Sequence, residues 1–343
     1  MLIIRPINID DLDHLMELLR GSAHGLTSLP LDREVLERRI RHSEGSFNHN
    51  YLYQPGGELY LFVMEDTEAK KIVGVSGIMS KIGGFEPFYF YRLEKQTKHS
   101  TLLDVDSEVT AMHVHKVYNG PAEICSLYLG KDFRNSQNGR FLSLSRFLYM
   151  ANNINLFETK VIAEMRGQVE DNGYSPFWES VGKKFFKISF LEADFLTMKN
   201  KVFIEELLPT YPIILELLPE EAQSVVGKVH KNTEPALHIL KKEGFNISNL
   251  VGIFEPGPVI SAEVSNIRTV KDSQCLQVTH IKKLENTNDQ DIKIISNLSK
   301  NDFRAALSQV IVEQEAVTID TQVADQLQVS IGDTIRCVNL RPS

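Results

Sequence analysis

The chain has 343 residues, 42% of them hydrophobic and 24% charged, and a formal net charge of −8 at pH 7. That length is enough for one large α/β domain with a small one, or for two medium domains, and a negative charge without a dense stripe of lysine and arginine argues against a nucleic-acid partner. No stretch approaches the roughly 18 apolar residues of a membrane span, and the three cysteines (Cys125, Cys275 and Cys337) form no CxxC pair, so we expect a cytoplasmic protein whose cysteines are small buried hydrophobic residues.

The first half of the chain alternates between strand and helix patterns. The periodicity of its apolar residues first predicts a strand at 2–7, a helix capped by Asp10 or Asp11, and a second helix at 33–41. An antiparallel hairpin of 59–64 and 72–79 follows, then an irregular aromatic segment at 85–91, a strand at 122–129 and a glycine-containing loop at 130–139 that leads into a helix. The last predicted elements of this half are a strand at 160–165, a short helix at 176–181 and an aromatic strand at 184–190.

The second half of the chain has a different pattern of apolar residues. Residues 203–245 look mainly helical and are punctuated by prolines; Pro235 suits the first turn of a helix that runs through Lys242 and is closed by Gly244. From about residue 256 the apolar runs become short and are separated by polar turns. We therefore expect a mixed α/β (α+β) fold with a sheet flanked by helices over residues 1–255, and a small β-rich C-terminal domain over residues 256–343.

The loop after the 122–129 strand contains Arg134, Asn138 and Gly139 in the run RNSQNG. A helix N-terminus presents unpaired backbone N–H groups and the positive end of the helix dipole, so this loop suits a pyrophosphate such as the one in coenzyme A. Together with the order of elements, it resembles the Arg-x-x-Gly-x-Gly loop of the GNAT superfamily of acyl-CoA-dependent N-acyltransferases. Gln137 stands where the first motif glycine is expected, and an ordinary β-to-α connection is the alternative.

Five further blocks resemble the arginine N-succinyltransferase family within that superfamily. They are residues 25–30 (GLTSLP), 123–129 (EICSLYL), 163–167 (AEMRG), 173–178 (GYSPFW) and 227–230 (GKVH). The resemblance implies succinyl transfer from succinyl-CoA to the α-amine of L-arginine, giving N2-succinyl-L-arginine in arginine catabolism. It implies His230 as the proton donor, Leu127 as a succinyl-CoA contact, and Leu129 at the strand end that pairs with the pantetheine arm.

The same resemblance implies small-molecule substrates, no permanently bound cofactor and a homo-oligomer. Histidine suits proton transfer because its unperturbed pKa near 6.5 leaves both forms available at cellular pH. Three alternatives stay open. His230 is a helix-end capping residue without a role in catalysis, the acceptor is ornithine, or the fold binds acyl-CoA without turnover, which the departure at Gln137 favours.

Each of the remaining candidate residues has a structural interpretation and a functional one. His113 and His115 alternate on one strand face, but no carboxylate or cysteine stands at a ligand spacing, so no metal site is expected. Cys125 lies in an apolar strand, where packing explains it better than nucleophilic catalysis. A second set is expected to form surface ion pairs or core contacts, with guanidinium or succinyl binding as the alternative for its charged members: Asp104, Asp106, Glu108, Glu164, Arg166, Phe177 and Trp178.

Overall fold

The computed structural model describes residues 1–21, 28–49, 54–170, 172–284 and 292–342. Its strands are β1 (Leu2–Pro6), β2 (Leu59–Asp66), β3 (Lys71–Met79), β4 (Phe88–Ser100), β5 (Val105–Val117), β6 (Ala122–Leu129), β7 (Lys160–Glu164), β8 (Ile213–Ile214), β9 (Asn246–Gly252), β10 (Pro258–Glu263), β11 (Gln274–Ile281), β12 (Lys293–Ser296), β13 (Ala305–Ser308), β14 (Ile311–Glu313), β15 (Ala316–Ile319) and β16 (Thr334–Asn339). Its α-helices are α1 (Leu12–Arg20), α2 (Arg33–Asn48), α3 (Ser136–Asn152), α4 (Lys183–Phe186), α5 (Phe190–Thr197), α6 (Val202–Leu207), α7 (Glu220–Val225), α8 (Glu234–Lys242), α9 (Arg268–Asp272) and α10 (Thr321–Leu327).

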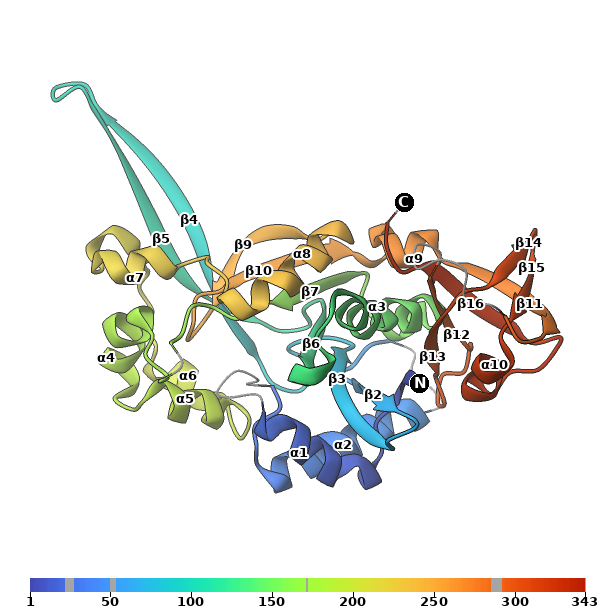
Figure 1. Ribbon diagram of the computed structural model, residues 1–343. Helices are drawn as coiled ribbons and strands as arrows, with labels where there is room; N and C mark the ends of the chain where they lie inside the picture. The colour runs from blue at the N-terminus through green and yellow to red at the C-terminus, as the bar shows by residue number, and fades with distance from the viewer. Residues whose placement is uncertain (22–27, 50–53, 171, 285–291, 343) are drawn as a thin grey trace.

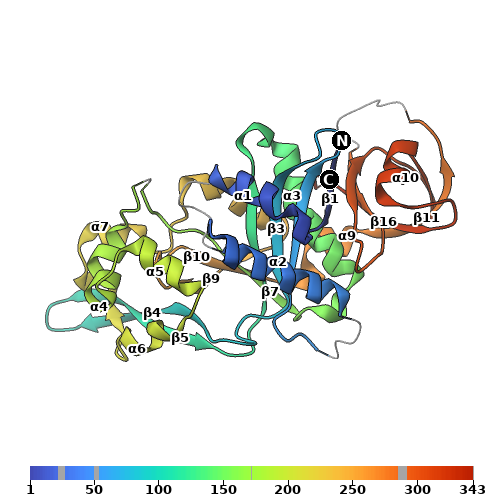
Figure 2. The same cartoon turned by 90° about the horizontal axis from the view of Figure 1, so that it is seen from below.

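All of these strands belong to one continuous mixed sheet. The strand order is β14-β15-β11-β16-β12-β13-β1-β2-β3-β6-β7-β10-β9-β4-β5-β8. The C-terminal strands join the rest because β13 pairs with β1, with Ile3 opposite Ala306. Figures 1 and 2 show this β-rich C-terminal part at one end of the molecule and the central strands between two layers of helices.

Each helical layer buries its own core against the sheet. On one face α3 and α8 cover the central strands, and Phe141, Phe147 and Leu240 pack there with Phe62 of β2. On the other face α1 and α2 pack their apolar stripes, including Leu15, against β2 and β3. Because both faces are covered, β2 and β3 read as nearly continuous apolar runs.

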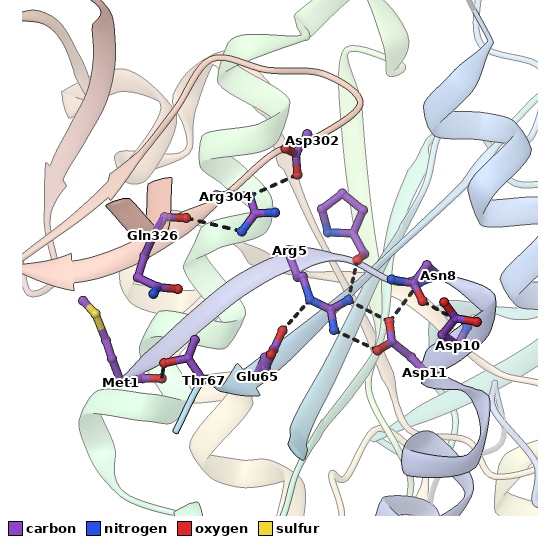
Figure 3. A network of polar contacts seen from close by, with 11 residues as sticks. Met1, Arg5, Asn8, Asp10, Asp11, Glu65, Thr67, Asp302, Arg304 and Gln326 are labelled. Carbon is purple, nitrogen blue, oxygen red and sulfur yellow. Dashed lines mark hydrogen bonds and ion pairs between the residues drawn. The ribbon is translucent and has the colours of Figure 1, made fainter. Parts of the chain in front are cut away.

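A buried ion-pair network fixes the place where the chain enters the sheet (Figure 3). The Arg5 guanidinium donates from Nη1 and Nη2 to the two carboxylate oxygens of Asp11, at 2.7 and 2.8 Å, and from Nε to Glu65. Asp11 also accepts the backbone N–H of Asn8 at 2.9 Å, as the second half of a capping box. Asn8, rather than Asp10 or Asp11, therefore provides the side-chain cap, and β1 is locked to β2 and to the first helical turn.

A long hairpin arm extends from the body. Strands β4 and β5 pair in unbroken register from Phe88 and Val117 to Ser100 and Val105. The outer half of the arm is exposed, and the arm projects away from the rest of the chain (Figure 1). Its tip presents Leu102, which is 91% exposed.

Most of the predicted architecture is confirmed. The mixed sheet flanked by helices, the opening strand and helix, the 59–79 hairpin, the loop into α3 and the β-rich C-terminal part all form. Helix α8 begins with Pro235 in its first turn, and Gly244 beyond its end has a φ of +102°. Phe177 and Trp178 are each 1% exposed, as expected of core residues. The division of the chain between residues 255 and 256 stays a prediction.

Three expectations are wrong. In the segment 85–91, expected to be irregular, residues 85–87 are so, but residues 88–91 are the start of β4. The aromatic strand expected at 184–190 is the short helix α4 with the start of α5. Its aromatic residues stack by helical packing instead, with the Trp178 and Phe186 rings parallel at 5.5 Å. Among the three free cysteines, Cys337 is buried and Cys125 is half-buried, but Cys275 is exposed.

Replacing Arg5 should destabilise the fold. In Arg5→Ala the Asp11 carboxylate stays buried without its cationic partner, which costs about 3 kcal/mol of unfolding free energy. The matched control is Arg33→Ala, because Arg33 pairs with Asp13 at an exposed site and should change stability by about 1 kcal/mol or less. Urea denaturation measures both variants, and equal losses would contradict the structural role of Arg5.

Candidate active site

The central feature of the site is the place where β6 and β7 part. These two strands run parallel but pair only at Ala122 with Val161 and at Glu123 with Ile162. Beyond Glu123, β6 continues to Leu129, and no strand of the described chain pairs with it on the β7 side. The second half of β6 therefore offers backbone N–H and C=O groups to an extended ligand, in the way that a sheet edge accepts a strand.

A β-bulge in β6 lies in the same stretch. The pairing of β6 with β3 shifts register between Val75 and Gly77, and Ser126 has a φ of +55°. Two contacts hold this conformation. The hydroxyl of Ser28 lies 2.9 Å from that of Ser126, and the buried Arg146 of α3 donates to the carbonyl of Cys125 at 3.4 Å.

The predicted contact residues Leu127 and Leu129 flank the end of this strand. Leu129 is buried in the core beneath α3, and Leu127 is half-buried against the same core. Their side chains therefore position the strand, while its backbone remains the part that faces the opening. The Leu129 carbonyl accepts a hydrogen bond from Arg134 Nε at 2.9 Å, which ties the loop to the strand end.

The predicted phosphate loop forms at the N-terminus of α3. Asn135 caps this helix, because its side-chain oxygen accepts the N–H groups of Gln137 and Asn138 at 3.0 and 2.7 Å. Asn138 in turn donates to the Phe133 carbonyl at 3.0 Å, and a Cβ atom at Gly139 would meet nothing within 4 Å. The space above Gly139 is thus open, and Asn135 occupies the two N–H groups that an anion would use.

His230 is held by backbone contacts with the residues that follow the C-terminal end of β7. Its backbone N–H donates to the carbonyl of Arg166 at 2.9 Å, and Val229 forms a bridge with Gly167. The side chain is 5% exposed, and its Nδ1 accepts the N–H of Asn232 at 3.1 Å. In the neutral ring the proton therefore sits on Nε2. His230 also caps the short helix Lys231–Thr233, so the structural role considered for it is real.

Two carboxylates stand on the sheet beside the parting strands. Glu123 in β6 is 9% exposed, and its burial raises the pKa to about 7, with Lys201 and Arg39 acting in the opposite direction. Glu164 ends β7; its side chain reaches solvent, yet desolvation by the surrounding protein raises its pKa to about 8. The sequence predicts a surface ion pair for Glu164, with guanidinium binding as the alternative, and the structure shows no ion pair of Glu164 with a described residue. The sequence does not single out Glu123, because no local spacing connects the two.

Several expected site residues come together and others do not. The C-terminal ends of parallel strands lie at the same edge of a sheet, so the end of β6, the α3 loop and the His230 attachment after β7 share one edge. Residues 25–27 lie outside the described residues. The arm carries Asp104, Asp106 and Glu108, away from this edge, and Asp106 and Glu108 form ion pairs with β4 as expected.

The other functional interpretations gain little support. Desolvation and the neighbouring Glu123 raise the pKa of the Cys125 thiol to about 11, which disfavours a nucleophilic thiolate. His113 approaches one carboxylate, that of Glu94, at 3.6 Å. Within the described ranges no group of three or more histidine, cysteine, aspartate or glutamate residues is placed to hold a metal ion. None of the helices in those ranges has the length and apolar character needed to cross a membrane.

Comparison with known proteins gives consistent matches over the whole chain. Residues 2–269 match the family described as arginine N-succinyltransferase beta subunit, and residues 274–339 match its C-terminal domain. The subunit beta of arginine N-succinyltransferase from Pseudomonas aeruginosa is 39% identical, covering 99% of this chain and 98% of the relative. The arginine N-succinyltransferase of Photorhabdus laumondii is 37% identical, covering 100% and 99%.

A solved structure agrees with these matches. The arginine/ornithine succinyltransferase subunit AI from Pseudomonas aeruginosa superposes with a TM-score of 0.89 and 31% identity, over 100% of this chain and 99% of the other.

The buried carboxylate of Glu123 should make stability depend on pH. Its folded pKa of about 7 lies above the unfolded value of 4.5, so the native state loses stability as the pH rises between these values. Glu123→Gln removes this loss, and its melting temperature should exceed that of the wild type at pH 8 by a few degrees, corresponding to at most about 3 kcal/mol, but not at pH 4.5. Glu263→Gln, at an exposed site on β10, is the control. A gain that is the same at both pH values would contradict the burial of a titrating carboxylate.

Proposed function

The chain belongs to the arginine N-succinyltransferase family, and we propose that it transfers the succinyl group of succinyl-CoA to the α-amine of L-arginine. As a member of that family it is an enzyme, an acyltransferase that takes an acyl-CoA as a substrate. The observation that supports the reaction best is the parting of β6 from β7 between the α3 loop and His230. One thioester C–S bond breaks and one amide C–N bond forms. The arginine ammonium loses two protons, of which one is balanced by the proton that the CoA thiolate gains and the other is released to solvent.

The acyl-CoA is proposed to lie along the second half of β6. The pantetheine arm would pair with the strand backbone near Leu127 and Leu129, on the β7 side of β6, where no described strand pairs with it. Its pyrophosphate would lie over Gly139 and beside Arg134, and would take the two α3 N–H groups from the Asn135 side chain. Gln137 does not prevent this arrangement, because the N–H groups come from the backbone.

His230 is proposed to give its proton to the leaving CoA thiolate. A neutral imidazole is too weak an acid to protonate a thiolate, so the ring donates as the imidazolium. Protonation of Nδ1 releases the Asn232 N–H that this atom accepts in the neutral ring, and Nε2 is the atom that gives its proton. Backbone N–H groups of β6 around Leu127 would hold the carbonyl oxygen as negative charge develops on it. The proton that His230 supplies is restored from solvent after CoA leaves.

A second acceptor has specific support. The superposed Pseudomonas aeruginosa protein is named an arginine/ornithine succinyltransferase subunit, so that related protein is described with both acceptors. Ornithine shares the α-amine of arginine and differs only at the distal end. We therefore propose ornithine as an alternative acceptor at the same site.

Removing His230 should slow the chemical step. His230→Ala should lower kcat by roughly 10²- to 10⁴-fold with an unchanged Kd for CoA, because a positioned acid contributes in that range. His238→Ala, at an exposed position of α8, is the matched control and should keep wild-type rates. Thiol release from succinyl-CoA, measured with a panel of amines that includes arginine and ornithine, gives the rates. Normal turnover by His230→Ala would refute the proposed acid, and no thiol release by the wild type with any amine would favour a module that binds acyl-CoA without turnover.

We also propose that the chain forms a homo-oligomer in the cytoplasm. The arm supports the first part, because a two-stranded hairpin with an apolar tip gains stability by packing on another surface. Three free cysteines, one of them exposed, support a reducing compartment.

Changing the arm tip should weaken the assembly. In the double variant Leu102→Ser and Leu103→Ser, two side chains that are 91% and 71% exposed lose their apolar contact area. The mass measured by light scattering should fall toward that of the monomer at a concentration where the wild type is assembled. Ile331→Ser, which replaces an exposed apolar residue in the C-terminal part, is the control. A wild type that is monomeric would refute the oligomer, and an unchanged mass in the double variant would exclude the tip as its contact.

A further inference from the structure

Glu123 and Glu164 project from the same face of the central sheet. Glu123 is paired with Ile162 across the parallel strands, and Glu164 follows Ile162 by two positions in β7. Directly paired residues of neighbouring strands point to the same side, and side chains two apart in a strand do so as well. The two carboxylates therefore share a face, and they interact electrostatically, since Glu123 is among the charges that raise the pKa of Glu164.

Neither carboxylate has a partner in the described part of the chain. The Glu123 side chain is only 9% exposed, yet it makes no hydrogen bond and no ion pair with any described residue. The Glu164 carboxylate likewise has none among those residues. Burying the Glu123 carboxylate without a partner is costly, and the exposed Glu164 carboxylate beside it is accessible to a ligand, so a cation supplied from outside the chain would pair with both.

The absence of a side chain at Gly252 leaves the space in which the Glu164 carboxylate lies. A Cβ atom at Gly252, the last residue of β9, would lie 2.6 Å from Glu164 Oε1. The carboxylate therefore rests against bare backbone, and any side chain at this position would push it away. Gly252 leaves space for the Glu164 carboxylate and does not donate to it, because its backbone N–H is bonded to the carbonyl of Gly257.

The distance from Glu164 to the attachment of His230 suits the length of an arginine. The His230 backbone is bonded to Arg166, two residues beyond Glu164, and at about 3.3 Å per residue in an extended chain this is about 7 Å. An extended arginine spans a comparable length from its α-amine to its guanidinium. An acceptor whose α-amine is near His230 can thus bring its guanidinium to Glu164, and Glu123 follows on the same face, opposite Ile162.

The surrounding charges favour a cation. Asp194 also acts electrostatically on Glu164, and burial raises the pKa of Asp194 to about 7. Lys201 is the positive group that opposes the shifts of both Glu123 and Glu164, but its Nζ lies over the Phe88 ring, 4.4 Å from the centroid, rather than in an ion pair with either. Arg39 is a second positive group, which of the two glutamates acts on Glu123 alone. The carboxylates Glu123, Glu164 and Asp194 still exceed these two cations, and a guanidinium with its five donors can contact both glutamates.

We propose that Glu123 and Glu164 bind the guanidinium of the acceptor and so select arginine over amino acids with a neutral side chain. The proposal rests on the acyl transfer to arginine proposed above. It assigns to the two glutamates a role in acceptor selection, separate from the proton transfer at His230.

The test compares two acceptors that share an α-amine. Rates with saturating succinyl-CoA are measured for L-arginine and for L-norleucine, whose side chain carries no charge, in the wild type, Glu164→Gln and Glu123→Gln. Each variant should lose roughly 10- to 100-fold in kcat/KM for arginine, mainly through KM, and keep its kcat/KM for norleucine, because a charge-assisted contact is lost only with arginine. Glu263→Gln on β10 is the matched control and should alter neither acceptor.

The other possible outcomes of this test would contradict either the role of the two glutamates or the proposed function. Equal losses for both acceptors would overturn the proposal and make the glutamates part of the proton transfer from the amine, and no loss with arginine would overturn it as well. CoA binding and the melting temperature check that the variants fold; if Glu123→Gln does not fold, the exposed Glu164 carries the test. If the wild type transfers no acyl group to arginine, the proposed function fails. Calorimetric binding of arginine against norleucine then still tests the two glutamates.

Discussion

The limited pairing of β6 with β7 is the constraint on which the rest of the site depends. Two parallel strands that stayed paired to their ends would leave no backbone free. Here the contact ends at Glu123, and the bulge at Ser126 turns the remaining strand while β3 holds its other edge. The α3 loop, the His230 attachment and Glu164 are all placed by the ends of these two strands. The site is therefore an interruption in the sheet, and the helices on both faces stabilise it.

Local signals explain what could be predicted from the sequence. Helix α8 has proline at its start and glycine after its end, and β2 and β3 are apolar runs around a polar turn. The sequence of 184–190 predicts a strand wrongly, because a short aromatic run has the same composition in a buried strand and in a short helix. The arm gives no sequence signal for a different reason: its outer strands are exposed on both faces, so they lack the alternation that a half-buried strand shows.

The residues of the candidate site likewise fall into two groups: those that local sequence motifs indicate, and those that only the fold brings together. His230, Leu127 and the loop with Arg134, Asn138 and Gly139 lie in compact motifs, so their residues could be named before the fold was known. Glu123 and Glu164 are brought together only by the register of β6 and β7, and the role of Gly252 depends on a third strand. The Asn135 cap was also not foreseen, although asparagine before a helix is a common cap.

The pairing of β1 with β13 has a consequence for the synthesis of the chain. Residues 3 and 4 sit between β2 and a strand that contains Ala305 and Ala306, so β1 leaves the ribosome long before this neighbour is made. Until then β1 presents an open apolar edge, which other chains can pair with. Such a long-range contact also slows folding. Conditions that slow translation near the C-terminus should therefore lower the soluble yield more than equal delays in the middle of the chain.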